Sequence, residues 1–137
     1  MSDPTAPTSR VSAALEQARR DLGRLSPAEA VEAQRRGALL VDTRTAVQRR
    51  CQGELPGAVV IDRTVLEWRL DPTSPHRIPE AGPGTPVILV CRQGYSSSFA
   101  AESLRRLGVE ASDVVGGVEA WLSAGLPVGD GPADVRE

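Results

Sequence analysis

The chain has 137 residues, of which 40% are apolar and 25% charged, so it is long enough to bury a core and too apolar for a disordered protein. Its 16 basic and 18 acidic residues give a net charge of -2 and form neither a basic stripe typical of nucleic-acid binding nor an acidic tail. All the cations are arginine, which excludes lysine-based Schiff-base or Walker-type chemistry, and a single histidine excludes a histidine-rich metal site.

The two cysteines, Cys51 and Cys91, are too few for a disulfide-dense secreted scaffold. The N-terminus has no apolar run of the signal-peptide type, and no segment approaches the roughly 18 apolar residues of a membrane span. We therefore expect a cytoplasmic protein with reduced thiols and without membrane or nucleic-acid partners. The exclusive use of arginine suggests a bacterial, GC-rich genome.

Two helices are predicted before the first strand. Residues 1–10 are polar and contain two prolines, so we expect a disordered tail. Apolar residues at a spacing of three and four predict an N-terminal helix within residues 11–24. A capping box of Ser26 and Glu29 predicts the start of the next helix, which a glycine at position 37 ends.

Four short apolar runs predict buried strands, at residues 38–41, 58–61, 87–90 and 114–115. The segments between and after them predict helices, over residues 45–50, 65–70, 97–107 and 117–124. This alternation predicts an α/β fold in which a small parallel β-sheet has helices on both faces. Ligands of such sheets bind beyond the carboxyl ends of the strands, which directs attention to residue 91.

Cys91 stands at the end of a predicted buried strand and precedes a glycine-containing loop and a helix that begins with serines. Loop N–H groups and the positive end of that helix would stabilise a thiolate, so we expect a depressed pKa for Cys91. Arg92 adds a cation. A buried cysteine can instead be a small apolar residue, but this position favours a functional thiol. Cys51, in a polar helix, and His76, in a proline-rich loop, lack such surroundings.

Residues 25–127 resemble the single-domain rhodanese-like sulfurtransferases. The active-site pattern Cys-x-x-Gly-x-Ser is present as Cys91, Gly94 and Ser96, and three more segments are similar to the family, at residues 41–44, 53–58 and 115–127. Glu54 departs from the pattern, since the family usually has histidine there, and we expect only a local effect on the turn. The resemblance implies a rhodanese-like domain over residues 25–128, followed by a flexible C-terminal tail at 129–137.

The resemblance implies a thiosulfate sulfurtransferase in which Cys91 is the nucleophile and carries a persulfide. The donor would be thiosulfate or another persulfide, and the acceptor cyanide, a thiol or a sulfur-carrier protein, with no metal and no cofactor. The persulfide-binding loop would consist of Arg92, Gln93, Gly94, Tyr95, Ser96 and Ser97. Asp42 and Arg44 are expected to form an ion pair that braces the site from behind. Trp68 and Arg69 are candidates for a pocket wall.

The same loop argues against two other cysteine-dependent enzymes. A cysteine phosphatase or arsenate reductase needs an arginine six residues after the cysteine to hold a tetrahedral oxyanion, and Ser97 occupies that position. A mercaptopyruvate sulfurtransferase would have Cys-Gly-Ser/Thr-Gly, which Arg92 and Gln93 do not match. The remaining alternative is a non-catalytic rhodanese-like module that binds a partner or regulates it.

Overall fold

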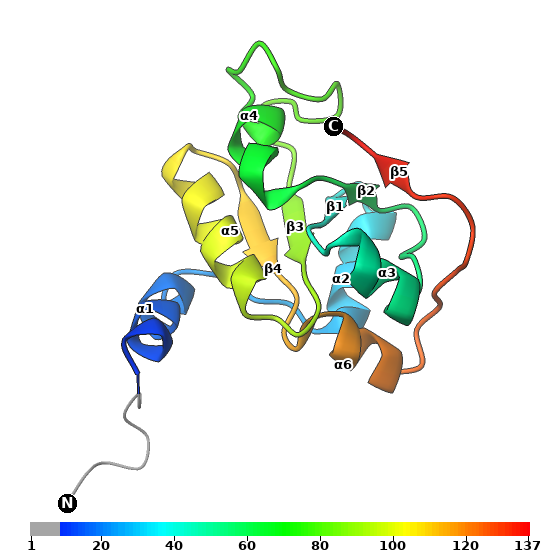
Figure 1. Ribbon diagram of the computed structural model, residues 1–137. Helices are drawn as coiled ribbons and strands as arrows, with labels where there is room; N and C mark the ends of the chain where they lie inside the picture. The colour runs from blue at the N-terminus through cyan, green and yellow to red at the C-terminus, as the bar shows by residue number, and fades with distance from the viewer. Residues whose placement is uncertain (1–8) are drawn as a thin grey trace, which may run out of the picture.

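The computed structural model describes residues 9–137 (Figure 1). Its helices are α1 (Arg10–Arg19), α2 (Pro27–Arg35), α3 (Ala46–Gln52), α4 (Leu66–Leu70), α5 (Ser96–Arg106) and α6 (Gly117–Ser123), with a 3-10 turn, η1 (Arg63–Val65), before α4. Its strands are β1 (Leu39–Asp42), β2 (Val59–Val60), β3 (Val87–Val90), β4 (Ala111–Asp113) and β5 (Asp134–Val135). The predicted disordered tail at residues 1–10 lies mostly outside the described residues; Ser9 caps α1, and Arg10 is its first residue.

The strands form one sheet in the order β4-β3-β1-β2-β5, and all four strand pairs are parallel. Side chains alternate between its faces. Leu40 and Ile88 belong to a core with α2 and α6, whereas Val41 and Leu89 belong to a core with α4 and α5. The predicted α/β fold with helices on both faces of a parallel sheet is therefore confirmed.

The register of the central strands brings the two most informative sequence motifs together. Asp42 at the end of β1 pairs with Val90 at the end of β3. Thr43, the residue that follows β1, donates its backbone N–H to the Val90 carbonyl at 3.0 Å. Cys91 therefore emerges beside Thr43 at the carboxyl edge of the sheet, the edge at which α/β proteins bind ligands.

The predicted capping box is present at the start of α2. The Glu29 N–H donates to Ser26 Oγ at 3.1 Å, and the Ser26 N–H donates to Glu29 Oε1 at 2.9 Å. A second capping box, formed by Thr45 and Gln48, begins α3. These bonds satisfy backbone donors that have no partner inside a helix, and so they fix where each helix begins.

The fourth strand differs from its prediction. Residues 114–115 were expected to form it, but β4 is Ala111–Asp113, and Val115 is already exposed. The strand contains Ser112 and the fully buried Asp113, whose polarity hides it from a search for apolar runs. The burial of Asp113 is possible because distant side chains satisfy its carboxylate.

Apolar residues in or next to α1, α5 and α6 lie at the surface. Val11 is 65% exposed, because only the C-terminal end of α1 and the residues after it pack on the core, through Ala18 and Leu22. Leu107 and Leu122 are also exposed; Leu107 lies at the C-terminal cap of α5, where the chain turns away. The apolar repeat of each helix thus extends beyond its contact with the core.

The C-terminal segment also differs from its prediction. Residues 129–137 were expected to form a flexible tail, but Asp134–Val135 is the edge strand β5, parallel to β2. The Arg136 N–H donates to the Val60 carbonyl at 2.9 Å, and its guanidinium pairs with Glu80 and Asp134. Polar, proline-containing composition does not reveal a strand whose stability comes from pairing with the sheet.

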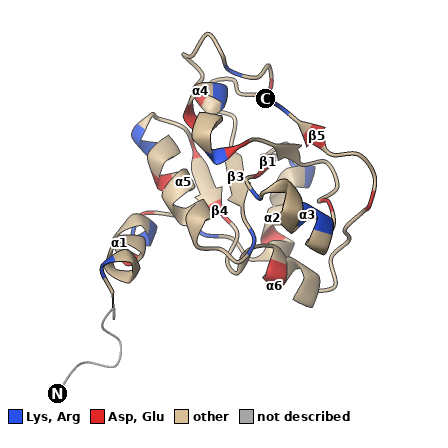
Figure 2. Ribbon diagram, in the orientation of Figure 1, with Lys and Arg blue, Asp and Glu red and all other residues tan. Residues whose placement is uncertain are grey.

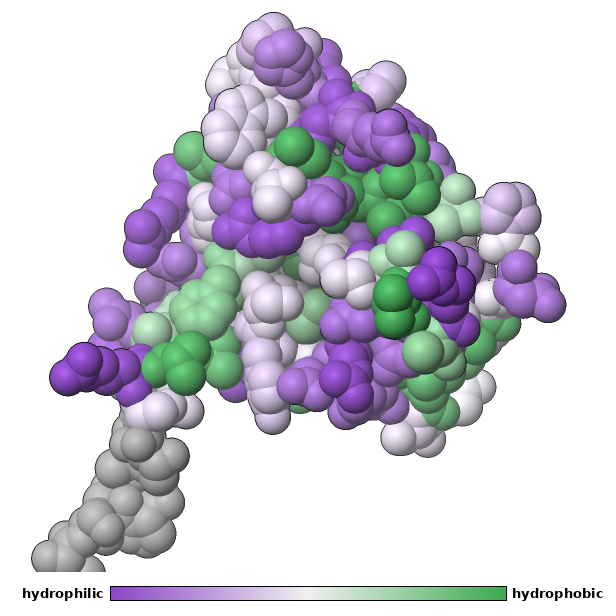
Figure 3. Space-filling model, viewed as in Figure 1, coloured by the Kyte–Doolittle hydropathy of each residue, from purple (hydrophilic) through white to green (hydrophobic). Residues whose placement is uncertain are grey.

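The surface mixes charges and small apolar areas. Basic and acidic residues are interspersed over the helices (Figure 2), and hydrophilic residues separate the apolar areas on the face shown in Figure 3. Within residues 9–137, every helix is too short or too polar to cross a lipid bilayer.

Candidate active site

Cys91 lies at the base of a small hollow at the carboxyl edge of the sheet. Its residue is only 5% exposed. The hollow has a volume of about 210 Å³ and is lined, besides Cys91, by Thr43, Gln48, Arg92, Gln93, Tyr95 and Ser96. Of the residues predicted to form the loop, Gly94 and Ser97 are buried behind this lining, and the others face it.

The loop after Cys91 turns back toward the sulfur. The Gly94 N–H donates to Cys91 Sγ at 3.2 Å. Gly94 has a φ of +89°, and a Cβ atom there would lie 2.7 Å from the backbone nitrogen of Gly116. Glycine is therefore required at this position both by the backbone angle and by the close approach of the loop to the start of α6.

The carbonyl groups at the start of the loop are bound by the N-terminus of α6. The first-turn amides of α6 donate to two of them, from Val118 to the Cys91 carbonyl at 2.9 Å and from Glu119 to the Arg92 carbonyl at 3.0 Å. In a trans peptide the C=O and the N–H point in opposite directions. The N–H groups of the same two peptides, those of Arg92 and Gln93, therefore point away from α6. Such an arrangement favours an anion at the sulfur.

The surroundings of Cys91 lower the pKa of its thiol. Burial raises the pKa, but hydrogen bonds from the hydroxyls of Ser97 and Ser96 and from the amides of Ser97 and Gly94 outweigh it. Ser97 has one hydroxyl proton, and its Oγ also lies 2.8 Å from Asp113 Oδ2, so the thiolate and this carboxylate share one donor. The thiolate is the nucleophilic form of cysteine.

The lowered pKa predicts a pH dependence of reactivity. A Cys51→Ser variant leaves Cys91 as the one thiol, because these are the only two cysteines in the sequence. In the folded protein, Cys91 should remain a thiolate at pH values at which an ordinary thiol is already protonated, because its pKa is lowered. Its rate of alkylation by iodoacetamide should therefore stay high as the pH falls, until the pH reaches that lowered pKa. The midpoint of rate against pH should therefore lie below that of the same variant unfolded in urea. An equal or higher midpoint in the folded protein would contradict the assignment.

Asp42 and Arg44 form a buried ion pair next to the site and do not line the hollow. The Arg44 guanidinium donates to Asp42 through Nε at 3.0 Å and Nη2 at 2.6 Å, and through Nη2 also to the Gly53 carbonyl at 2.9 Å. Its Nη1 reaches Gln52 at 3.3 Å. The pair thus connects the end of β1 to the end of α3.

Trp68 and Arg69 do not reach the hollow, contrary to the pocket-wall expectation. Trp68 is 57% exposed and lines a separate hollow with Ser103 and Leu107. Arg69 donates through Nη1 to the His76 carbonyl at 2.8 Å. The reason is the position of α4, which packs against the C-terminal half of α5, two turns away from Ser96.

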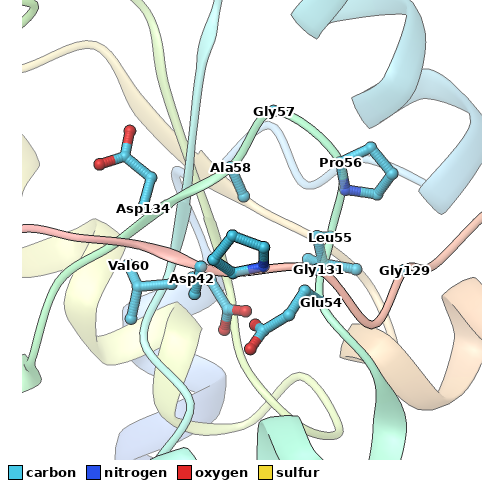
Figure 4. Close-up of a pocket in the computed structure, with 12 residues that line it drawn as sticks. Asp42, Glu54, Leu55, Pro56, Gly57, Ala58, Val60, Gly129, Gly131 and Asp134 are labelled. Atoms are coloured by element: carbon cyan, nitrogen blue, oxygen red, sulfur yellow. The ribbon is translucent and has the colours of Figure 1, made fainter.

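A second hollow, of about 320 Å³, lies between residues 54–58 and the segment 129–134 (Figure 4). Its lining contains no cysteine. Glu54, at the position of the family's usual histidine, pairs there with Arg49 at 3.1 Å, and Asp42 is occupied by Arg44. This hollow is the larger of the two, but its lining offers no thiol, and the carboxylates of Asp42 and Glu54 are already paired with arginines.

Three charged residues behind the loop were not identified from the sequence: Arg19, Arg24 and Asp113. They contact the loop or the start of α5 from outside the hollow. Both arginines lie more than 60 residues before Cys91, and no motif or spacing links them to it. The buried carboxylate of Asp113 is the one feature that indicates a charged partner nearby.

The fold and the site together define a class of α/β proteins. In this class, a buried cysteine lies at the carboxyl edge of a parallel sheet and accepts a hydrogen bond from a backbone amide. The family model of the rhodanese-like domain matches residues 26–124. The chain therefore belongs to the rhodanese-like domain family.

Several individual proteins are similar to parts or most of this chain. A maize protein named adenylyltransferase and sulfurtransferase MOCS3-1 is 37% identical over 62 residues, which cover 44% of this chain and 13% of that protein. The chain thus corresponds to a small part of the length of such curated relatives. A Rhodopseudomonas palustris protein of unknown function, named a possible tyrosine phosphatase, is 27% identical with a TM-score of 0.78, covering 93% of this chain and 99% of that one. A thiosulfate sulfurtransferase from Pseudomonas aeruginosa shares the fold, with a TM-score of 0.66 at 22% identity over 82% of this chain and 20% of that one.

Proposed function

We propose that this protein is a sulfurtransferase that carries a sulfane sulfur as a persulfide on Cys91. The observation that carries the proposal is the hydrogen bond of 3.2 Å from the Gly94 N–H to Cys91 Sγ, in a loop whose hydroxyls and amides lower the pKa of that thiol. A thiolate is needed to attack sulfur, and the same donors suit the negative charge of a persulfide. Family membership and the sulfurtransferase names among the relatives support the proposal.

The proposed reaction has two steps. In the first, the Cys91 thiolate attacks the outer sulfur of thiosulfate, a new S–S bond forms, the S–S bond of thiosulfate breaks, and sulfite leaves with the bonding electron pair. In the second, cyanide or a thiolate attacks the terminal sulfur of the Cys91 persulfide, and the Cys91 thiolate leaves. Charge is conserved in both steps, no external oxidant is needed, and the covalent intermediate predicts ping-pong kinetics.

The hollow suits a small anionic donor. Its volume of about 210 Å³ is below the roughly 300–1,000 Å³ of typical small-molecule sites, so a small donor or the tip of a larger acceptor fits best. Arg92 stands half-exposed at the rim, where its ion pair with Glu119 is long, at 3.8 Å, and equally exposed, so the pair is weak and the guanidinium is available to an entering anion. Thiosulfate is therefore the donor that we propose for assay, and a thiol or a sulfur-carrier protein is the proposed acceptor in the cell.

A tyrosine phosphatase, the activity in the name of the Rhodopseudomonas relative, lacks support in this loop. A phosphatase loop closes on phosphate with an arginine six residues after the cysteine. Ser97 occupies that position, is fully buried, and lies with its Oγ 2.8 Å from Asp113. The tetrahedral oxyanion would lack the arginine that closes such a loop.

The test is direct detection of the persulfide. After incubation with thiosulfate, intact-mass analysis should show one additional sulfur atom on the native protein and on the Cys51→Ser variant, and none on Cys91→Ser. Cyanide should then remove that sulfur and release an equal amount of thiocyanate. A native protein that gains no sulfur and yields no thiocyanate would refute sulfur transfer and favour the partner-binding module instead.

A further inference from the structure

The segment before the family match contacts the loop that follows Cys91. The family model begins at residue 26, but α1 packs against α5, which begins at the active-site loop (Figure 1). The contact is more than apolar packing, because arginines in and after α1 reach the loop itself. Residues outside the family's common region therefore shape the surroundings of Cys91 in this chain.

Two guanidinium groups bind one carbonyl of the loop. Arg19 donates through Nη2 to the Gly94 carbonyl at 2.7 Å, and Arg24 donates to the same oxygen at 3.1 Å. Arg19 also donates through Nε to Ser98 Oγ, in the first turn of α5, at 3.0 Å. One planar group thus connects the loop to the helix that follows it, with the fixed geometry that a guanidinium provides.

A buried carboxylate holds the second arginine in place. Asp113 is 0% exposed, and Arg24 reaches its two oxygens at 2.9 Å and 3.2 Å. The hydroxyls of Ser97 and Ser98 each donate to Asp113 Oδ2 at 2.8 Å. Two cations and one anion leave this cluster with a net positive charge beside a site that would carry a negative sulfur.

The position of the Gly94 carbonyl determines where the next N–H points. In a trans peptide the Gly94 C=O and the Tyr95 N–H are antiparallel. Arg19 and Arg24 hold the carbonyl from outside the hollow, whereas Tyr95 lines the hollow. A carbonyl fixed on the outer side directs the Tyr95 N–H toward the opposite side of the loop. Hydrogen bonds from cations also polarise the peptide and strengthen its N–H as a donor.

We propose that Arg19 is a positioning residue of the active site: by holding the Gly94 carbonyl and Ser98 together, it orients the loop donors around Cys91 and so sets the reactivity of its thiolate. This inference deepens the proposed function, because the same donors would hold the persulfide. It assigns to the N-terminal helix a role that the common family region does not contain.

The test compares Arg19 with Arg20, the C-cap residue that follows it. All variants carry Cys51→Ser, so that Cys91 alone reacts. Arg19→Ala removes both hydrogen bonds, Arg19→Lys keeps the charge but replaces the planar fork by one nitrogen, and Arg20→Ala is the matched control, since Arg20 is an exposed arginine. Iodoacetamide alkylation is measured against pH, and urea unfolding shows whether each variant is folded.

We expect Arg19→Ala to alkylate about tenfold more slowly than the parent at neutral pH, the effect of losing a charged hydrogen bond, with the midpoint of its pH profile moved upward. Arg19→Lys should recover only part of the rate, and Arg20→Ala should match the parent. Folded Arg19→Ala that reacts as fast as Arg20→Ala would overturn the proposal. Full recovery in Arg19→Lys would also overturn it, because charge alone would then suffice.

Alkylation uses no sulfur donor, so its outcome is independent of the proposed reaction. Slower alkylation of Arg19→Ala, in a protein whose parent gains no sulfur from thiosulfate, would refute sulfur transfer and leave the positioning role intact. Normal alkylation of Arg19→Ala, in a protein that forms the Cys91 persulfide, would refute the positioning role alone. Should Arg19→Ala fail to fold, Arg19→Lys carries the same comparison.

Discussion

Asp42→Ala should lower the free energy of unfolding by about 3–5 kcal/mol, because it leaves the Arg44 guanidinium buried without its counter-charge. Both side chains of the pair are essentially inaccessible to water. Arg44 would keep only the Gly53 carbonyl and the Gln52 side chain as acceptors. Since domains of this size are stable by about 5–15 kcal/mol, the loss is a large part of the total.

Urea unfolding measures this effect, and a surface pair provides the control. Glu32 pairs with Arg36 at 3.2 Å, with side chains that are 51% and 77% exposed. Glu32→Ala removes the same kind of charge but should change stability by less than about 0.5 kcal/mol. If Asp42→Ala proves no more harmful than Glu32→Ala, the Asp42–Arg44 pair does not brace the strand end.

Gly117→Ala should disrupt both the fold and the active-site loop. Gly117 has a φ of +57°, and a Cβ atom there would lie 2.7 Å from the backbone nitrogens of both Gln93 and Gly94. Backbone atoms cannot move aside as a flexible side chain can, so the loop must shift. Backbone strain and overpacking together should lower the free energy of unfolding by about 2–5 kcal/mol. The displaced Gly94 N–H should also slow alkylation of Cys91.

Gly125→Ala separates the effect of backbone strain from the effect of overpacking. Gly125 has a φ of +72°, but no atom lies within 4 Å of the Cβ position. Alanine there should cause only the strain of its backbone angle, about 1–2 kcal/mol, and leave the reactivity of Cys91 unchanged. Equal alkylation rates for the two variants would show that contact between α6 and the loop does not control the thiol.

The sequence predicts best those elements whose cause is local. The continuous apolar run at residues 87–90 corresponds to β3 because a strand covered on both faces needs apolar residues throughout. The capping box of Ser26 and Glu29 corresponds to the start of α2 because its bonds join residues three apart. The local sequence around Cys91 likewise predicts that it lies at a strand end and next to the N–H donors of the following loop.

Features that depend on distant partners could not be predicted from the sequence. Asp113 belongs to a buried strand because Arg24, 89 residues earlier in the chain, neutralises it. Arg19 reaches Gly94 across 75 residues. Trp68 had the chemistry of a pocket wall, but the packing of α4 against the far half of α5 places it elsewhere. Composition identifies such residues as unusual without identifying what they contact.

The short strand β5 has a consequence for how this protein behaves in concentrated solution. It covers the outer side of β2, whose Val59 and Val60 are both buried. An uncovered strand of this kind offers its backbone to any other chain and invites intermolecular pairing. Asp134 and Arg136 instead present charges at that border. The C-terminal segment therefore occupies the edge of β2 that another chain would otherwise reach.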